Sequence, residues 1–152
     1  MNMFKGRHMK NNRGFTLIEL LVVIAIIGLL ATLAVIALGT ARQHQRDAER
    51  LSELRDVRGQ LERYFIDHNS YPLATSPIIF GEIGVTCLGV EGFGAACANP
   101  YIEALPTDPN KGDYLYRSQD GSSYEMFARL ESDINGLQEN IRVTPNTIEN
   151  VN

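Results

Sequence analysis

The hydrophobic and polar positions divide the first half of the chain into a continuous apolar run and a segment with helical periodicity. Residues 20–39 carry no charge, and a run of this length is sufficient for a helix to cross the hydrocarbon core of a bilayer. Residues 40–68 contain no proline, and their apolar positions recur three or four residues apart, as on one face of a helix. We therefore predict one helix over residues 15–68, ended by Pro72, because the residue before a proline resists the helical conformation. Its second part has one apolar stripe that covers a sheet: Leu51, Leu54, Val57, Leu61, Tyr64 and His68.

The other positions of residues 40–68 carry basic and acidic side chains in alternation. Pairs of opposite charge at helical spacing contribute only ~0.2–0.5 kcal/mol each. A row of arginines on a helix is also typical of proteins that bind nucleic acid, but here the interleaved acids leave little net charge. We therefore predict a solvated surface whose charges pair with one another on the same helix. The charged positions are Arg42, Arg46, Arg50, Arg55, Arg58 and Arg63 with Asp47, Glu49, Glu53, Asp56 and Glu62.

Residues 69–152 predict a small β domain. Alternating positions in residues 114–118 and 123–130, joined by the turn pair Asp120-Gly121, predict a hairpin. Residues 72–113 are rich in glycine and turn residues and predict a long connection dominated by loops, and residues 141–144 predict one more short strand before a frayed tail. A segment of this size is marginal for a core of its own. The predicted fold class is therefore α+β, with the long N-terminal helix packed on a small antiparallel sheet.

The only two cysteines, Cys87 and Cys97, lie within that connection. In an exported domain such a pair predicts a disulfide, which would contribute roughly 2.5–3 kcal/mol by closing a short loop. A metal site is a poor alternative, because there are two thiols and no histidine nearby. Two free buried thiols remain the alternative in an organism without oxidative folding.

The charges before the apolar run predict its orientation in a membrane. All charges before Glu19 are basic, and by the positive-inside rule the N-terminus stays cytoplasmic while the residues after Gly39 are exported. The apolar run is too long for an ordinary secretory signal. An uncleaved single-span anchor for the exported domain is therefore one interpretation. The basic residues are Lys5, Arg7, Lys10 and Arg13.

The stretch Gly14-Phe15-Thr16-Leu17-Ile18-Glu19 resembles the processing signature of type IV pilins and type II secretion pseudopilins. The resemblance covers residues 10–72 and needs the basic leader, the glycine, the phenylalanine, the glutamate and the apolar run together. It implies that prepilin peptidase cuts after Gly14 and that the new terminal Phe15 is N-methylated. It also implies a pilin-like order of segments: a leader over residues 1–14, a transmembrane and filament-core helix over 15–39, the amphipathic half of that helix over 40–68, and an exported β domain over 69–152. The start of translation stays open among Met1, Met3 and Met9.

Within that resemblance Glu19 has a role in assembly. An ionisable group at the edge of a membrane segment is a candidate functional residue. Its carboxylate can pair with the amine that cleavage creates on Phe15, in the same chain or in the next subunit, and removing one member of a buried pair costs ~3–5 kcal/mol. The alternative is that Glu19 extends to the interface without a partner.

The resemblance implies a structural subunit that polymerises through its N-terminal helix into a pilus or a secretion pseudopilus. The implied partners are further copies of the chain, prepilin peptidase, the inner-membrane assembly platform and, before assembly, the lipid bilayer. The implied location is the cytoplasmic membrane, crossed once with the N-terminus inside, and then a filament in the periplasm, cell envelope or extracellular space. A minor tip subunit that binds DNA, a surface or cargo is the alternative, and the sequence does not separate these filaments.

Residues 69–152 contain eleven acids and four bases, so DNA binding is not expected of this domain. Two oxygen-rich runs make calcium a weaker alternative to solvated turns, although neither has the spacing of a known calcium loop. No nucleophile, phosphate loop or metal-spaced cluster indicates an enzyme, and we expect no other cofactor. The calcium candidates are Asp108, Asn110, Asp113, Glu131 and Asp133.

Overall fold

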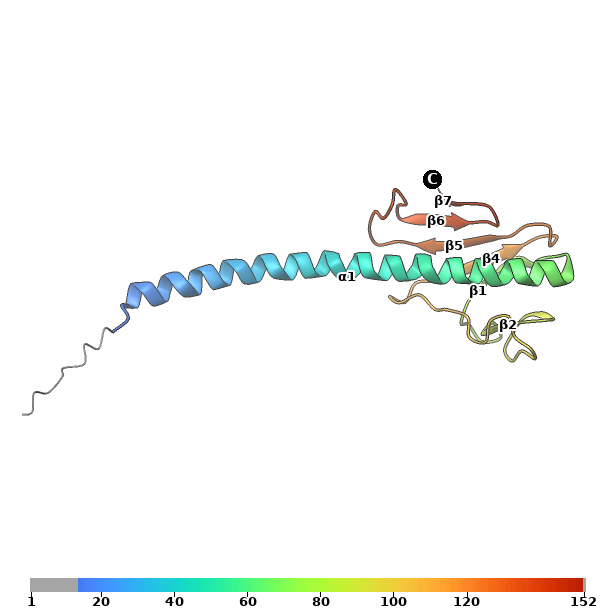
Figure 1. The fold of residues 1–152 in the computed structure, drawn as a ribbon, viewed down its shortest axis with the longest axis horizontal. Coiled ribbons are helices and arrows are strands. Elements are labelled where there is room, and N and C mark those ends of the chain that lie inside the picture. Colours follow the sequence, from blue (N-terminus) through green and yellow to red (C-terminus); the bar gives the residue numbers. More distant parts are fainter. Residues whose placement is uncertain (1–13, 152) are drawn as a thin grey trace, which may run out of the picture. The chain divides into compact units, whose positions relative to one another are not determined.

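The computed structural model describes residues 14–151, which form one long helix and two antiparallel sheets (Figure 1). Helix α1 spans Leu17–His68. Contacts divide the chain into two units, one ending at Gly39 and the other beginning at Thr40. The five-stranded sheet has the order β1-β4-β5-β6-β7, and β2 pairs with β3 in the second sheet. The strands are β1 (Ala74–Ile79), β2 (Cys87–Gly89), β3 (Gly92–Gly94), β4 (Leu115–Ser118), β5 (Glu125–Arg129), β6 (Asn140–Val143) and β7 (Ile148–Asn150).

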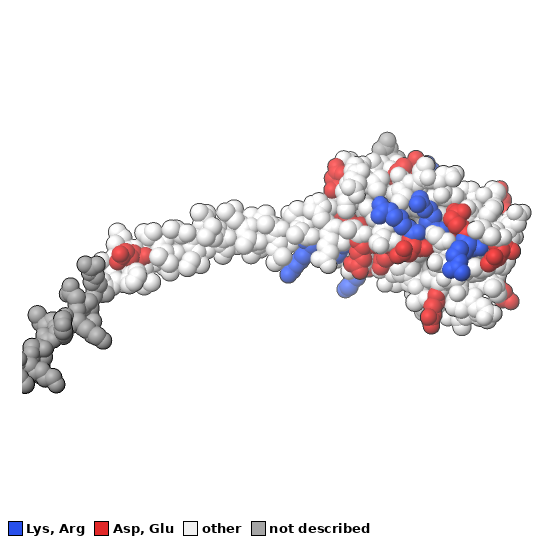
Figure 2. Space-filling model, viewed as in Figure 1, with Lys and Arg blue, Asp and Glu red and all other residues white. Residues whose placement is uncertain are grey.

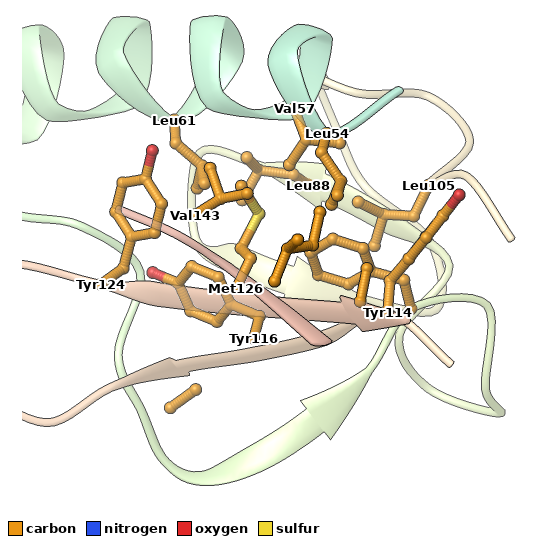
Figure 3. Close-up of a cluster of buried hydrophobic side chains, with 14 of the residues drawn as sticks. Leu54, Val57, Leu61, Leu88, Leu105, Tyr114, Tyr116, Tyr124, Met126 and Val143 are labelled. Carbon is orange, nitrogen blue, oxygen red and sulfur yellow. The ribbon is translucent and has the colours of Figure 1, made fainter. Parts of the chain in front are cut away.

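The second part of α1 packs on the five-stranded sheet, as the periodicity predicted. Leu54 and Leu61 have no exposed surface, and the same is true of Met126 and Val143 on the sheet. Figure 3 shows Leu61 directed from the helix toward Val143 and Met126. Truncating a buried leucine of this kind typically costs about 2–5 kcal/mol. The predicted fold class, a long helix on a small antiparallel sheet, is confirmed.

The C-terminal end of α1 also follows the prediction. Asn69 has a φ of 52°, in the left-handed region, and its N–H donates to the carbonyl of Phe65 at 2.7 Å, as in common helix stops. His68 is the one exception in the predicted apolar stripe. It is exposed and stacks on Tyr64, with 4.1 Å between ring centroids.

For the C-terminal domain, one prediction is incomplete and one is wrong. The connection over residues 72–113 consists mostly of loops, as predicted, but it also contains three short strands, and β1 pairs with β4 at an edge of the main sheet. The sequence did not indicate β1 because this strand contains Pro77, and proline argues against a central strand. Proline is tolerated at an edge or a bulge, and the β1–β4 register indeed shifts between Ala74 and Ile78. The expected frayed tail instead forms β7, which pairs with β6 through Ile148 and Val143.

Candidate functional site

The described part of the N-terminal unit begins with a short non-helical segment. Gly14, Phe15 and Thr16 precede the first helical residue, Leu17, and all three are exposed. A side-chain carbon placed on Gly14 would meet no atom within 4 Å. The Gly14–Phe15 peptide bond therefore lies in exposed, non-helical chain directly before the helix. The predicted basic leader lies outside the described residues.

Thr16 and Glu19 close a capping box at the start of α1. The Glu19 Oε2 atom accepts the Thr16 backbone N–H at 2.8 Å and the Thr16 hydroxyl at 2.7 Å. The Glu19 N–H donates to Thr16 Oγ1 at 3.3 Å. This reciprocal arrangement satisfies backbone donors that a helix start otherwise leaves without partners.

The capping role of Glu19 was missing from the sequence prediction, which considered only an amine partner or extension to the interface. The signal was present, because threonine followed three residues later by glutamate is the capping-box pattern. Both bonds use Oε2, and within residues 14–151 the structure shows no donor to Oε1. One oxygen of Glu19 is therefore available to a donor from outside the described chain.

Within residues 14–151, no other segment covers the apolar part of α1. Among the described residues, α1 is the one helix long and apolar enough to cross a membrane, and Figure 2 shows a white surface along this segment with one acidic patch beside the grey residues. The Thr32 hydroxyl donates to the carbonyl of Leu29 at 2.7 Å, which satisfies it inside the helix. Exposed apolar surface of this extent marks a partner or a membrane. Its large side chains are Leu17, Ile18, Leu20, Leu21, Val22, Val23, Ile24, Ile26, Ile27, Leu29, Leu30, Leu33, Val35, Ile36 and Leu38.

A buried ion-pair cluster joins the second part of α1 to two loops of the β domain. The Arg50 guanidinium donates to Asp47 Oδ1 at 2.7 Å and to Asp108 Oδ2 at 2.6 Å. It also forms an ion pair with Glu131 Oε1 at 2.8 Å. The side chain of Arg50 is 2% exposed and that of Asp47 is fully buried. Arg46 adds a second guanidinium that binds Glu131. The helix is thereby fastened to both loops at one point.

The carboxylates of the cluster also hold loop backbone. Asp47 accepts the N–H groups of Glu131 and Ser132 at 2.9 and 2.8 Å, and the Ser132 hydroxyl at 2.6 Å. Asp108 accepts the N–H groups of Asn110 and Gly112 at 2.7 and 3.1 Å. Buried charges are tolerated when such bonds satisfy their remaining lone pairs.

These contacts shift the protonation equilibria of the acids. Hydrogen bonds from Arg46, and then from Arg50, lower the pKa of Glu131 to about 2. Burial alone would raise the pKa of Asp47, but the bonds from Ser132, the Glu131 N–H and Arg50 lower it overall. The pKa of Asp108 is lowered in the same way, with burial outweighed by Arg50 and two backbone N–H groups. All three carboxylates are therefore held in the charged form.

The structure corrects the predicted solvated surface at Asp47 and Arg50, which are buried partners of distant loops. The structure also shows that the calcium candidates have other partners. Asp108 and Glu131 bind Arg50, and Asp133 accepts the side-chain amide of Gln138 at 3.0 Å. Over residues 14–151 no three acidic, histidine or cysteine side chains converge as a metal site. The guanidinium groups of Arg46 and Arg50 occupy the space between the two acidic loops that a metal ion would need.

Cys87 and Cys97 are joined by a disulfide, with 6.0 Å between their Cα atoms. Cys87 is the first residue of β2, and a side-chain carbon placed on Gly89 in that strand would come within 2.8 Å of the Cys97 Cβ. The covalent loop is therefore tightly packed against β2. Leu88, between these residues, is part of the hydrophobic core.

Comparisons with known proteins add independent observations. Residues 9–39 match the family model described as the prokaryotic N-terminal methylation motif. The type II secretion system core protein G of Klebsiella pneumoniae is 34% identical over 115 residues, which cover 70% of this chain and 74% of that protein. The core protein G of Vibrio cholerae is 28% identical over 131 residues, covering 80% of this chain and 82% of that protein.

A third relative is similar over a shorter stretch. The type IV wide pilus major component PilA4 of Thermus thermophilus is 48% identical over 63 residues, covering 41% of this chain and 48% of that protein. No solved structure matches the chain significantly.

Proposed function

Because the chain belongs to the family of type IV pilins and type II secretion pseudopilins, which are structural subunits and not enzymes, we propose that it is a filament subunit made as a membrane-anchored precursor. In this proposal prepilin peptidase cuts the precursor after Gly14. The new N-terminus at Phe15 is methylated, and the mature chain polymerises through the N-terminal part of α1.

The observation that carries the proposal is the arrangement of the N-terminal unit. An open Gly14–Phe15 bond stands immediately before the capped start of a helix whose large apolar side chains over residues 17–38 are all exposed. In lipid such a helix is stable as a single span, since its backbone groups are satisfied internally. In a filament the same side chains are buried against other copies of the helix. One surface thus serves both states of the subunit.

Glu19 acts at the transition between these states. Its Oε2 atom holds the helix start through Thr16, and its second oxygen accepts the amine of Phe15, from the same chain or from a neighbouring subunit. Outside water an unpaired charge is costly. Arrangements in which every amine and every carboxylate is paired are therefore favoured over arrangements that leave some of them unpaired. Glu19 therefore favours neighbours that bring an amine to it.

The proposed partners are further copies of the chain, prepilin peptidase, the inner-membrane assembly platform and the bilayer. The four basic residues before Gly14 favour a cytoplasmic N-terminus and an exported domain. The extent of similarity favours a secretion pseudopilus over a pilus. The two core G proteins match over 70% and 80% of this chain, whereas PilA4 matches over 41%.

The experiment that tests the proposal is N-terminal sequencing and intact-mass measurement of the membrane-purified protein, with and without co-expressed prepilin peptidase. We expect the co-expressed protein to begin at Phe15 and to be heavier than that sequence by one methyl substitution. A chain that keeps Gly14 beside an active peptidase would overturn the proposal and leave an uncleaved membrane anchor.

A further inference from the structure

The side of α1 that faces away from the sheet carries four exposed charges at a regular spacing. Arg42, Glu49, Asp56 and Arg63 follow one another every seven residues. Seven residues return the helix to within about 20° of the starting direction, so the four side chains lie in an arc of about 60°. None of the ion pairs found over residues 14–151 includes any of them. We call these four residues the charged row.

The helix surface beside the charged row is accessible to another helix. Ala48, Ser52 and Gly59 are small and exposed, and a side-chain carbon placed on Gly59 would meet no atom within 4 Å. Packed helices lie 8–10 Å apart, the shorter distances requiring small side chains. A second helix can therefore approach closely enough for long charged side chains to meet across the contact.

The partner that fits this surface is a second copy of the chain. Under the proposed function every copy enters the bilayer in the same orientation, so facing helices are parallel. If two parallel copies stand in register, each of the four residues faces the same residue of the other copy, which gives four contacts between like charges. Like charges placed opposite each other are destabilising, so the row opposes in-register packing.

An axial offset changes this balance. With an offset of one heptad, about 10.5 Å along the helix, two contacts are between opposite charges and one is between Glu49 and Asp56. With an offset of two heptads, about 21 Å, Arg42 of one copy meets Asp56 of the other and Glu49 meets Arg63. No like charges meet at that offset, so the charged row is self-complementary there.

We propose that the charged row is a docking surface for a second copy of this chain and that it favours an offset of two heptads between facing helices. This inference rests on the proposed function, because it requires parallel copies. Because both copies present the same face, the contact joins two copies and sets the axial offset between them, while the exposed apolar side chains of residues 17–38 remain available to further copies. The charged row thus opposes in-register neighbours and favours staggered ones.

The test is filament yield from full-length variants in cells that contain the assembly machinery. R42E/R63E leaves only acids in the row and E49R/D56R leaves only bases, and each is expected to lower the filament yield at least about tenfold, equivalent to 1.4 kcal/mol. The inverted quadruple variant R42E/E49R/D56R/R63E is again self-complementary at two heptads and is expected to restore the yield. Co-expression of the two double variants is expected to restore it as well.

A matched control has the same change of charge elsewhere. K111E/R117E alters two exposed basic residues of the β domain and is expected to assemble like the wild type. Cysteine crosslinking measures the offset directly. Q45C co-expressed with G59C, positions two heptads apart, is expected to crosslink, whereas a S52C–S52C crosslink would indicate in-register packing.

The outcomes separate this inference from the proposed function. If the wild type is not processed and forms no filaments, the proposed function fails. If the wild type forms filaments but the quadruple variant assembles no better than the double variants, or all variants assemble equally, the charged row does not determine the offset and only this inference is overturned.

Discussion

Arg50 on helix α1 and Asp108 in the loop before β4 are joined by two hydrogen bonds, of 2.6 and 2.9 Å, between side chains that are 2% and 3% exposed. This forked contact is the geometry that a guanidinium offers to a carboxylate. It links residues 58 positions apart. The helix and the loops of the β domain are therefore held together by charge as well as by apolar packing.

Replacing Arg50 with methionine should destabilise the β domain by about 3–5 kcal/mol, because it leaves buried carboxylates without their cation. Denaturant unfolding of the detergent-solubilised protein measures this. R55M changes an exposed arginine of the same helix and should cost less than about 0.5 kcal/mol. Equal stability of the two variants would show that the buried cluster contributes nothing.

The same cluster predicts how stability depends on pH. The pKa values of Glu131, Asp47 and Asp108 are lowered in the folded protein, so the stability from these groups is fully present above their unfolded pKa values, near 4. It is lost as the pH falls through the folded values, down to about 2 for Glu131. Stability measured from pH 6 to pH 2 should therefore fall below pH 4.5. E131Q should fall less steeply, and an unchanged slope in that variant would contradict the assignment.

Local sequence patterns predicted some features of this structure and could not predict others. The stripe Leu51, Leu54, Leu61 needs only a periodicity, so it predicted the packed face of the helix. The burial of Asp47 could not be predicted from local sequence, because it depends on Ser132, 85 positions away. A helix with alternating charges predicts the same solvated surface until the tertiary partners are known.

The two strands that the sequence did not predict, β1 and β7, have a different cause. Strand β1 contains Pro77 and a register shift, so its alternation is broken, and β7 is only three residues long. Both are edge strands whose pairing partners, β4 and β6, supply most of the order. Thr16 and Glu19, in contrast, form a local pattern that the sequence displayed and that was interpreted only in terms of charge.

Calcium should have little effect on the stability of this domain. Arg50 binds Asp108 and Arg46 binds Glu131, so two of the carboxylates considered as calcium ligands already have cations. We expect the thermal unfolding midpoint to be the same in calcium and in a chelator. D133N should also leave the midpoint unchanged in both conditions, whereas a large shift with calcium that D133N abolishes would establish a metal site.

The disulfide should contribute to the stability of the loop that contains β2 and β3. C87S/C97S is expected to lower the free energy of unfolding by roughly 2.5–3 kcal/mol in the chain-entropy model. The wild type after reduction should unfold like this variant. Hydrogen exchange should localise the loss to residues near β2, since Leu88 connects the disulfide to the core; loss spread evenly over the sheet would contradict a local role.

The capping and charge-pairing roles of Glu19 can be separated by two substitutions. E19Q keeps a side-chain oxygen that can accept from Thr16, since glutamine also completes a capping box, but it removes the charge that would pair with the amine of Phe15. T16A keeps the charge and removes the hydroxyl of the cap, at a cost of about 1 kcal/mol to the helix start. We expect E19Q to abolish filament assembly while hydrogen exchange at the first turn stays close to wild type. We expect T16A to speed that exchange and to retain most of the assembly. The reverse pattern, with T16A defective and E19Q assembling, would mean that Glu19 acts by starting the helix and that charge pairing does not drive polymerisation.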